Sequence, residues 1–534
     1  MNTNMKNRDY VLLYVNGERK IVKGENIFLT MTDYLRDILH LTGTKIVCAE
    51  GDCGACTVLK ASISYSSSSD SDSDSDSKFK FEAVNSCIAS VHLFDCSQVV
   101  TVEGLRGLLK RPLSEKREDE RILNPIQNAL VTEHGSQCGF CTPGIALTMT
   151  EMFVNTDNNN ANNDCNKKSK NKNIDEKEIK NCLTGNLCRC TGYQGIINAG
   201  LHVANDKNLL EVAKKSLDVY QKCEIYKDLE QHKNIPIIIE SASKNFYAPT
   251  DIHEAINFKV EGIKADEKTY VFSSATDLGV QINKDFIAPT RILSLNSISN
   301  LYEIKEESRN GVEGIILGAK VSLSRLQNFV RKKIPELYNF LFVFASPQIK
   351  NMGTIVGNVA NASPIGDTLP FLLVMDATLI IQGQNHSKNH EREVKITEFF
   401  KGYKKYDLAE NELITHIFIP IVELSNGAVL KLYKVSKRKD LDISTINAAY
   451  LIKFNNSDNK IEKINISYGG VAATPLRLKK TENYLLGKVL DQNTVDETIK
   501  LISSEISPIS DVRGHASYRN QLAINLFKKF YCEL

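Results

Sequence analysis

The chain has 534 residues, which is long enough for roughly three to four domains with separate buried cores. Its 66 basic and 64 acidic residues leave a net charge of +2, which gives no electrostatic case for binding nucleic acid or an anionic membrane surface. The N-terminus lacks a signal-peptide pattern, and the most apolar stretch, residues 369–381, is too short for a membrane span, so we expect a soluble, cytoplasmic protein.

The first hundred residues predict a small sheet with one helix. Residues 9–31 have the pattern of a β-hairpin, and residues 30–43 that of a capped amphipathic helix ending at Gly43. Residues 57–64 and 78–87 indicate paired strands, separated by an acidic Ser/Asp repeat at 66–77. The repeat predicts a disordered surface loop, and the strands can still pair because closure entropy grows only slowly with loop length.

The next hundred residues are helical. Helical patterns cover residues 124–135, 142–155, 175–185 and 191–205, with an Asn/Lys-rich insertion at 155–173 that we expect to be disordered. After that, short β-type runs alternate with helices. We therefore expect domains at 9–104, 105–205, 239–422 and 423–534, with residues 206–238 as a linker.

Eight of the 13 cysteines fall into two groups of four. In a reducing compartment, such groups bind metal or carry redox chemistry more often than they form disulfides. The groups are Cys48, Cys53, Cys56 and Cys87, then Cys138, Cys141, Cys188 and Cys190. The scattered remainder are expected to be buried or incidental thiols: Cys96, Cys165, Cys182, Cys223 and Cys532.

The first group has the plant-type [2Fe–2S] spacing. Three cysteines follow C-x4-C-x2-C, and a later strand supplies the fourth. Gly51 and Gly54 allow the tight turns that bring backbone N–H groups towards cluster sulfurs. Structural zinc is the alternative, but its sites usually pair two short C-x2-C-type knuckles, which this loop does not resemble.

The second group, C-x2-C followed by C-x-C, could by spacing alone bind zinc or a second [2Fe–2S] cluster. Two helix signals favour the cluster. Cys141 precedes Thr142 and Pro143, an N-cap and first-turn proline, and Cys190 precedes Thr191 and Gln194, a capping-box pattern. Helix N-termini suit a cluster of net negative charge because they present unpaired N–H groups.

Several motifs in this order resemble the xanthine dehydrogenase family of molybdenum hydroxylases. They are CAEGDCGACTV, NSC, HGSQCGFCTPG and NLCRCTGY, followed by FSSATDLG, NMGTIVGNVANASPIGD, KVSKRKDLDIS, YGGVAATPLR and SDVRGHASYR. The resemblance implies a multidomain α+β fold. Its parts are a β-grasp ferredoxin domain, an all-α four-helix [2Fe–2S] domain, a two-part α+β FAD-binding domain of the vanillyl-alcohol-oxidase type, and an α+β C-terminal domain.

The residues alone would not have identified a flavin site. The sequence contains no G-x-G, so a Rossmann fingerprint is excluded, and the glycine-bearing segments 273–279 and 353–358 could equally be ordinary turns.

The resemblance assigns these segments to FAD. It implies that the pyrophosphate and ribityl region is held by Phe272, Ser273, Ser274, Ala275, Thr276, Asp277, Leu278 and Gly279, with Thr354, Ile355, Val356, Gly357 and Asn358. It further implies ring or cofactor contacts for Phe344, Asp367, Ile414 and Lys434. Lys437 and Arg438 fall in a basic loop near the flavin or in a solvated turn.

The family resemblance also implies a direction of electron flow. Substrate is hydroxylated at a molybdenum–molybdopterin centre, and electrons pass through the helical-domain cluster and the plant-type cluster to FAD and NAD+. The chain ends before any molybdenum-binding half. We therefore expect the small subunit of a split, bacterial-type xanthine dehydrogenase, joined to a molybdenum-binding large subunit in a heterotetramer or larger assembly, with no catalytic residue of its own.

Two alternatives remain open. A related molybdenum hydroxylase would act on an aldehyde or another N-heterocycle, or pass electrons to oxygen, and the substrate pocket that decides this lies on the partner. A non-catalytic iron–sulfur sensor or zinc scaffold would carry a recognition surface such as a basic helix, and the sequence has no such motif.

Overall fold

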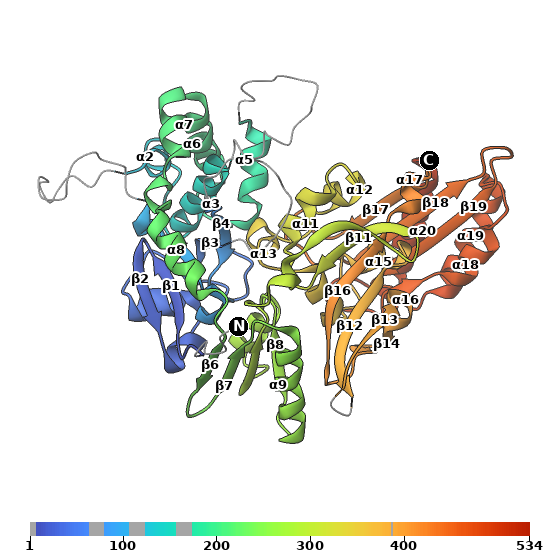
Figure 1. Cartoon of the computed structure of the whole chain (residues 1–534). Coiled ribbons are helices and arrows are strands. Elements are labelled where there is room, and N and C mark those ends of the chain that lie inside the picture. Colours follow the sequence, from blue (N-terminus) through green and yellow to red (C-terminus); the bar gives the residue numbers. More distant parts are fainter. Residues whose placement is uncertain (1–6, 64–78, 106–122, 156–173, 386–387) are drawn as a thin grey trace, which may run out of the picture. The chain divides into compact units, whose positions relative to one another are not determined.

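The computed structural model describes residues 7–63, 79–105, 123–155, 174–385 and 388–534 (Figure 1). The predicted Ser/Asp and Asn/Lys insertions, with Cys165, lie outside these residues. The chain divides into two compact units. Unit 1 comprises Met1–Thr250, Thr269–Ser297 and Ser346–Met352, and unit 2 comprises Asp251–Lys268, Ile298–Ala345 and Gly353–Leu534. None of the helices in the described ranges is long and apolar enough to cross a membrane.

Unit 1 begins with a five-stranded mixed sheet of order β2-β1-β5-β3-β4. Its strands are β1 (Val11–Val15), β2 (Glu18–Val22), β3 (Thr57–Ser62), β4 (Glu82–Asn85) and β5 (Ser97–Val100). The predicted hairpin is confirmed by β1 and β2, and the predicted strand pair by β3 and β4. The parallel pairing of β1 with β5 places the last strand beside the first, as the β-grasp arrangement requires.

The helix predicted to end at Gly43 ends earlier. Thr30 caps its start by accepting the Asp33 N–H at 3.1 Å, as the sequence indicates. The helix α1 (Met31–Asp33) then widens into the π-turn η2 (Tyr34–Ile38). Beyond it, Arg36 donates to the carbonyls of Thr42 and Thr44 at 2.9 and 2.7 Å, and these bonds stabilise a non-helical path.

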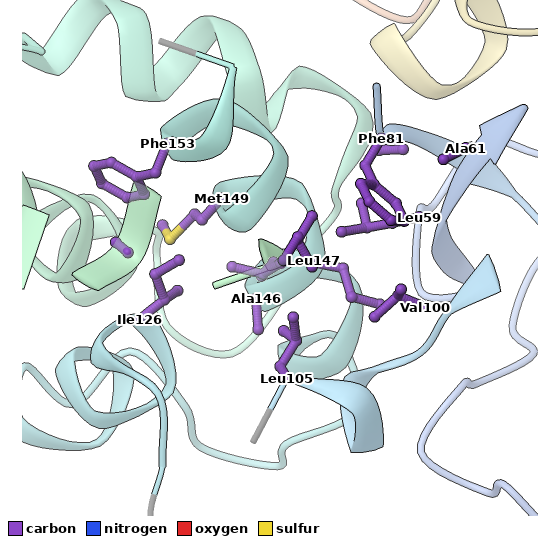
Figure 2. Close-up of a cluster of buried hydrophobic side chains, with 14 of the residues drawn as sticks. Leu59, Ala61, Phe81, Val100, Leu105, Ile126, Ala146, Leu147, Met149 and Phe153 are labelled. Atoms are coloured by element: carbon purple, nitrogen blue, oxygen red, sulfur yellow. The ribbon is translucent and has the colours of Figure 1, made fainter. Parts of the chain in front are cut away.

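The four helices predicted after the ferredoxin-type sheet are present among the described residues. They are α2 (Pro125–Thr132), α3 (Thr142–Val154), α5 (Glu176–Cys182) and α6 (Gln194–Asn205). The most buried is α3, and Figure 2 shows its side chains among Ile126 of α2 and the strand residues Leu59 and Val100. The helical bundle and the sheet therefore share one hydrophobic core.

The segment expected as a linker, 206–238, is helical and packs against both parts. It contains α7 (Lys207–Lys214), η7 (Asp218–Tyr220) and α8 (Cys223–His232). Its buried residues join the shared core: Ala213, Leu217, Tyr220, Ile225 and Leu229. The amphipathic spacing of these residues explains why the segment is ordered instead of extended.

A second sheet of unit 1, of order β6-β7-β9-β8, carries the first flavin segment. Its strands are β6 (Ile237–Glu240), β7 (Asn245–Ala248), β8 (Thr269–Phe272) and β9 (Arg291–Ser294). The short helix α10 (Leu278–Asn283) connects β8 to β9, and α13 (Pro347–Lys350) packs on β4 of the first sheet.

Unit 2 contains the remaining sheets and helices. One sheet has the order β10-β11-β16-β12-β13, with β10 (Ile304–Arg309), β11 (Val312–Gly318), β12 (Thr378–Asn385), β13 (Lys388–Lys395) and β16 (Glu412–Pro420). A second has the order β17-β18-β19-β20, with β17 (Val429–Val435), β18 (Ile446–Phe454), β19 (Ile461–Gly469) and β20 (Leu476–Arg477). A two-stranded sheet pairs β14 (Phe400–Gly402) with β15 (Lys405–Tyr406).

Helices cover these sheets of unit 2. The first group is α9 (Ile252–Lys264), η8 (Ser299–Tyr302), α11 (Leu323–Val330), α12 (Pro335–Phe340), α14 (Ile355–Asn361), α15 (Leu369–Val374), α16 (Ile396–Phe399) and α17 (Val422–Ser425). The C-terminal group is α18 (Lys479–Leu485), α19 (Gln492–Glu505) and α20 (Ala516–Cys532), which lie along β18 and β19 (Figure 1). The expected multidomain α+β class is confirmed.

Candidate cofactor-binding sites

The loop of the first cysteine group wraps around its own sulfur atoms. Cys48 Sγ accepts the backbone N–H groups of Glu50 and Cys53, each at 3.5 Å. Gly51 and Gly54 have φ of 81° and 67°, a left-handed conformation that favours glycine. The turns that the sequence predicted at these two glycines are therefore present.

The four thiols of this group form a chain of contacts in the order Cys53, Cys48, Cys87 and Cys56. The pKa of Cys48 is lowered, chiefly by its hydrogen bond with Cys53, and the same bond raises the pKa of Cys53. A bond with Cys87 lowers the pKa of Cys56, and bonds with Cys48 and then Cys56 raise that of Cys87. Four thiols in mutual contact fit a two-iron cluster, which takes four cysteine sulfurs.

The second group is more exposed. Cys138 and Cys190 lie at the surface with their sulfur atoms 3.5 Å apart, while Cys188 is buried and Cys141 is half-buried. Burial, followed by a bond with Cys188, raises the pKa of Cys141 to about 12. Although burial opposes it, bonds from Thr191 lower the pKa of Cys188. These four thiols form two pairs, which fit a second two-iron cluster. Within the described residues, no group of three or more His, Cys, Asp or Glu side chains is arranged for a single metal ion.

The two N-caps predicted beside this group, Thr142 and Thr191, are wrong, whereas the first-turn position of Pro143 is confirmed. Cys141 itself is the N-cap of α3, and Thr142 Oγ1 pairs with Ser136 at 2.8 Å. Thr191 does not cap α6, because its hydroxyl lies 3.1 Å from Cys188 Sγ and Tyr193, with φ 69°, occupies the N-cap. Thr191 therefore contacts a ligand sulfur. Its spacing to Gln194 had suggested a helix cap instead.

The two ligand loops are in direct contact within unit 1. The Leu187 N–H donates to the Cys53 carbonyl at 2.9 Å. Their glycines pack backbone to backbone: a Cβ on Gly54 would lie 2.1 Å from the Gly185 oxygen, and one on Gly144 would lie 2.2 Å from the Gly54 oxygen. No side chain fits between the loops at these positions.

A distant residue, Gln348 of α13, supports this contact. Its buried side-chain N–H groups face Asn186 Oδ1 at 2.9 Å, Thr148 Oγ1 at 3.2 Å and Thr57 Oγ1 at 3.5 Å. One amide thus joins both cysteine-bearing domains. Sequence reasoning missed Gln348, because it follows the last cysteine of the second group by more than 150 residues and has no spacing that relates it to them.

The scattered thiols lie apart from the two groups. Cys96 is buried, and burial raises its pKa. Cys182 is half-buried and donates to the Thr148 carbonyl at 3.4 Å. Cys223 and Cys532 are exposed.

The first flavin segment, Phe272 to Gly279, lies in unit 1 between β8 and α10. Phe272, Ser274 and Ala275 are buried, Ser273, Thr276 and Leu278 are half-buried, and Asp277 is exposed. Ala275 has φ 59°, so the segment turns through a left-handed residue of the kind found in anion-binding nests. A Cβ on Gly279 would lie 1.9 Å from the Ile88 oxygen. Close packing of the two backbones therefore requires glycine here, whether or not Gly279 also contacts the cofactor.

The second flavin segment lies in unit 2 and begins a helix. Thr354 caps α14 by accepting the Gly357 N–H at 3.0 Å, and Asn358 Oδ1 accepts from Thr368 at 2.7 Å. Ile355 and Val356 are buried, whereas Gly357 is exposed. Among the described residues, a Cβ added to Gly357 would come close to Thr354 Oγ1 alone. This open backbone fits the close approach of a phosphate group.

The other expected flavin residues of unit 2 fall into a buried polar cluster and two separate positions. Lys434 Nζ lies 2.6 Å from Asp367 Oδ2, and the other Asp367 oxygen accepts from Ser444 and Asn447 at 2.5 and 2.8 Å. Ile414 is buried in β16. Phe344 is half-buried.

The basic loop residues Lys437 and Arg438 are exposed. Lys437 Nζ donates to the Val512 carbonyl at 3.1 Å, and Arg438 forms an ion pair with Asp442 at 3.7 Å. Both residues therefore lie in a surface turn, and their proximity to the flavin stays a prediction.

Four family models match consecutive parts of the chain. They are a 2Fe-2S iron-sulfur cluster binding domain at residues 13–92, a [2Fe-2S] binding domain at 112–201, an FAD binding domain in molybdopterin dehydrogenase at 241–422, and a CO dehydrogenase flavoprotein C-terminal domain at 431–534.

Curated relatives match over nearly the whole chain. Xanthine dehydrogenase 1 of Arabidopsis thaliana is 28% identical over 97% of this chain and 39% of its own length. The xanthine dehydrogenase of Emericella nidulans is 28% identical over 98% of this chain and 38% of its own length. The chain thus spans about two-fifths of these relatives.

Solved structures match about half of the chain. A carbon monoxide dehydrogenase from Hydrogenophaga pseudoflava is 25% identical, with a TM-score of 0.48, over 53% of this chain and 94% of that chain. Quinoline 2-oxidoreductase from Pseudomonas putida 86 is 22% identical, with a TM-score of 0.48, over 55% of this chain and 98% of that chain.

The family models follow the order of the cysteine loops and flavin segments, and the relatives extend over the same order. The chain therefore carries two [2Fe–2S]-binding domains followed by an FAD-binding domain, the set of domains found in molybdenum hydroxylases, and it is similar to xanthine dehydrogenases.

Proposed function

We propose that this chain is the electron-transfer and NAD-reducing subunit of a xanthine dehydrogenase that acts in cytoplasmic purine catabolism. A separate molybdenum-binding large subunit hydroxylates hypoxanthine and xanthine to urate, and this chain passes the electrons to NAD+. When bound, the iron–sulfur clusters carry single electrons and the flavin converts them into a hydride. The xanthine dehydrogenases among the curated relatives support the choice of substrate.

The observation that carries this proposal is the contact between the two ligand loops. Leu187 directly precedes Cys188, and its N–H binds the Cys53 carbonyl, so a single hydrogen bond connects a ligand residue of the first group to the residue next to a ligand of the second group. Electron tunnelling weakens steeply with distance, and a bonded route is more effective than a gap. The residues of this chain therefore hold the two groups in series and leave no room for a side chain between them.

The exposure of the helical group supports an order for the relay. Cys138 and Cys190 lie at the surface beside Phe140 and Leu187, which are 47% and 41% exposed, whereas Cys56 and Cys87 are buried. Exposed apolar side chains next to polar surface are typical of protein interfaces. We place the molybdenum-binding partner at the helical group, so that electrons enter there and leave through the plant-type group.

The test is purification of the native complex, with metal analysis and a substrate assay. We expect molybdenum on a second subunit, about four iron atoms per copy of this chain, as two [2Fe–2S] clusters require, and xanthine-dependent reduction of NAD+. Activity with only an aldehyde or another N-heterocycle would reassign the substrate, and electron delivery to oxygen alone would reassign the acceptor. A zinc-loaded, colourless chain would overturn the relay itself.

A variant tests the order of the relay. Cys53→Ser should abolish NAD+ reduction and leave a single turnover of xanthine oxidation by the large subunit intact. The matched control is Cys223→Ser, which changes an exposed thiol outside both groups and should alter neither reaction. Normal xanthine-driven NAD+ reduction in Cys53→Ser would show that the order is wrong.

A further inference from the structure

The helix that follows the first flavin segment is bonded directly to the plant-type ligand set. Asn283, the last residue of α10, donates one side-chain N–H to the Cys87 carbonyl at 2.7 Å and the other to the Ala49 carbonyl at 2.9 Å. Ala49 follows the ligand Cys48, and Cys87 is the fourth ligand from a separate strand connection. One carboxamide therefore joins the two chain segments that supply the ligands.

Further contacts hold α10 against the plant-type ligand loop. Lys284 Nζ lies 3.3 Å from the Cys48 carbonyl and 3.3 Å from Glu50. At the other end of α10, Gly279 packs against the Ile88 backbone, one residue after Cys87. All these contacts lie within unit 1.

The bonds from Asn283 fall on a strained part of the loop. Ala49 has φ 55°, a left-handed conformation that disfavours residues with a Cβ. Such a residue persists when neighbouring bonds hold it in place. Asn283 supplies one of those bonds and is itself half-buried.

We propose that Asn283 is a positioning residue that holds both segments of the plant-type ligand set on the flavin-segment helix and raises the cluster's reduction potential. This inference rests on the proposed function above. Each amide N–H brings a partial positive charge to a carbonyl beside a ligand, and reduction adds negative charge to the cluster. Hydrogen bonds and local charge are among the factors that set such potentials, so removing these donors disfavours reduction.

The experiment compares Asn283→Ala and the isosteric Asn283→Asp with the wild type, each as the full chain. A redox titration followed by electron paramagnetic resonance measures the potential of each cluster. We expect the potential to fall from wild type to Asn283→Ala to Asn283→Asp, because the aspartate adds a negative charge. At a fixed potential near the midpoint, Asn283→Ala should lower the ratio of reduced to oxidised plant-type cluster by roughly fivefold, the effect of about one net hydrogen bond. The helical group should titrate as in wild type.

The matched control is Gln281→Ala on the same helix, whose amide donates to Asp277 and which should leave both clusters unchanged. Loss of iron from the plant-type site alone in both Asn283 variants, with Gln281→Ala fully loaded, would also support the holding role. Iron-loaded Asn283 variants with the wild-type potential and wild-type spectrum would overturn the proposal.

The same measurements separate this inference from the proposed function. A wild-type chain that binds neither iron nor flavin contradicts the proposed function. Equal potentials in a wild type and variants that all bind both cofactors contradict the role of Asn283 alone.

Discussion

Replacing Gly54 by alanine should disturb both cysteine groups, although Gly54 belongs to the first group only. The new Cβ would lie 2.1 Å from the Gly185 oxygen and 2.8 Å from Asn186 Nδ2, so the second ligand loop must move. The left-handed φ of 67° costs about 1–2 kcal/mol for alanine, and overpacking costs about 1–3 kcal/mol more. The expected destabilisation is therefore roughly 2–5 kcal/mol.

Gly192→Ala is the matched control for this change. Gly192 has φ 63°, close to that of Gly54, but no atom of the described residues lies within 4 Å of its Cβ position, so only the backbone cost of about 1–2 kcal/mol applies. Urea unfolding measures the difference, and electron paramagnetic resonance reports each cluster separately. If Gly54→Ala matched Gly192→Ala in stability and left the helical-group signal unchanged, the backbone contact between the loops would be refuted.

Three further predictions concern buried polar groups. Asp367→Asn leaves the Lys434 ammonium buried without its carboxylate and should destabilise unit 2 by about 3–5 kcal/mol, measured by urea unfolding. Burial lowers the pKa of Lys259 to about 8, below its unfolded value of about 10.5. Between pH 8 and 10.5 the unfolded chain therefore keeps a proton that the folded chain has lost, so the free energy of unfolding should rise with pH. Lys259→Met should remove that rise. Gln348→Ala should cost about 1–3 kcal/mol because Asn186 and Thr148 lose a buried partner, measured by the thermal midpoint.

Each of these three predictions has a control measurement. Lys434→Met should cost less than Asp367→Asn, because Asp367 keeps the Ser444 and Asn447 donors, and equal losses would contradict that reasoning. A pH profile of Lys259→Met that parallels the wild type would show that Lys259 does not cause the rise. Gln384, which is half-buried and whose amide forms an exposed hydrogen bond with Asn257, serves as the control for Gln348, and an equal effect of Gln384→Ala would remove the argument from burial.

The sequence was sufficient for features that depend on local spacing. Alternating and helical patterns predicted the β1–β2 hairpin and the helices around the second cysteine group. Cysteine spacing separated two groups of four thiols, and within each group the thiols contact one another, while their role as cluster ligands stays a prediction. The flavin residues stay predictions, because they came from a family resemblance and their cofactor contacts are not tested by the packing of the chain.

Features that depend on long-range contacts could not be predicted. The Thr191 capping box matched a local pattern, but the hydroxyl is directed to Cys188 Sγ. Residues 206–238 were expected as a linker because their sequence does not indicate which hydrophobic core they pack against. Gln348 and Asn283 contact residues of the cysteine-bearing domains that precede them by 162 residues or more, and no spacing rule spans such separations.

Gln221 binds the backbone of Phe79 on both sides, accepting its N–H at 2.7 Å and donating to its carbonyl at 2.8 Å. Phe79 is the first described residue after the Ser/Asp repeat, so the strand that delivers Cys87 is anchored by a residue more than 140 positions away. Evolution can therefore lengthen, shorten or replace the repeat without changing the register of β4. Changes in the Ser/Asp repeat therefore leave the position of Cys87 unchanged, although the repeat lies within the domain that binds the cluster.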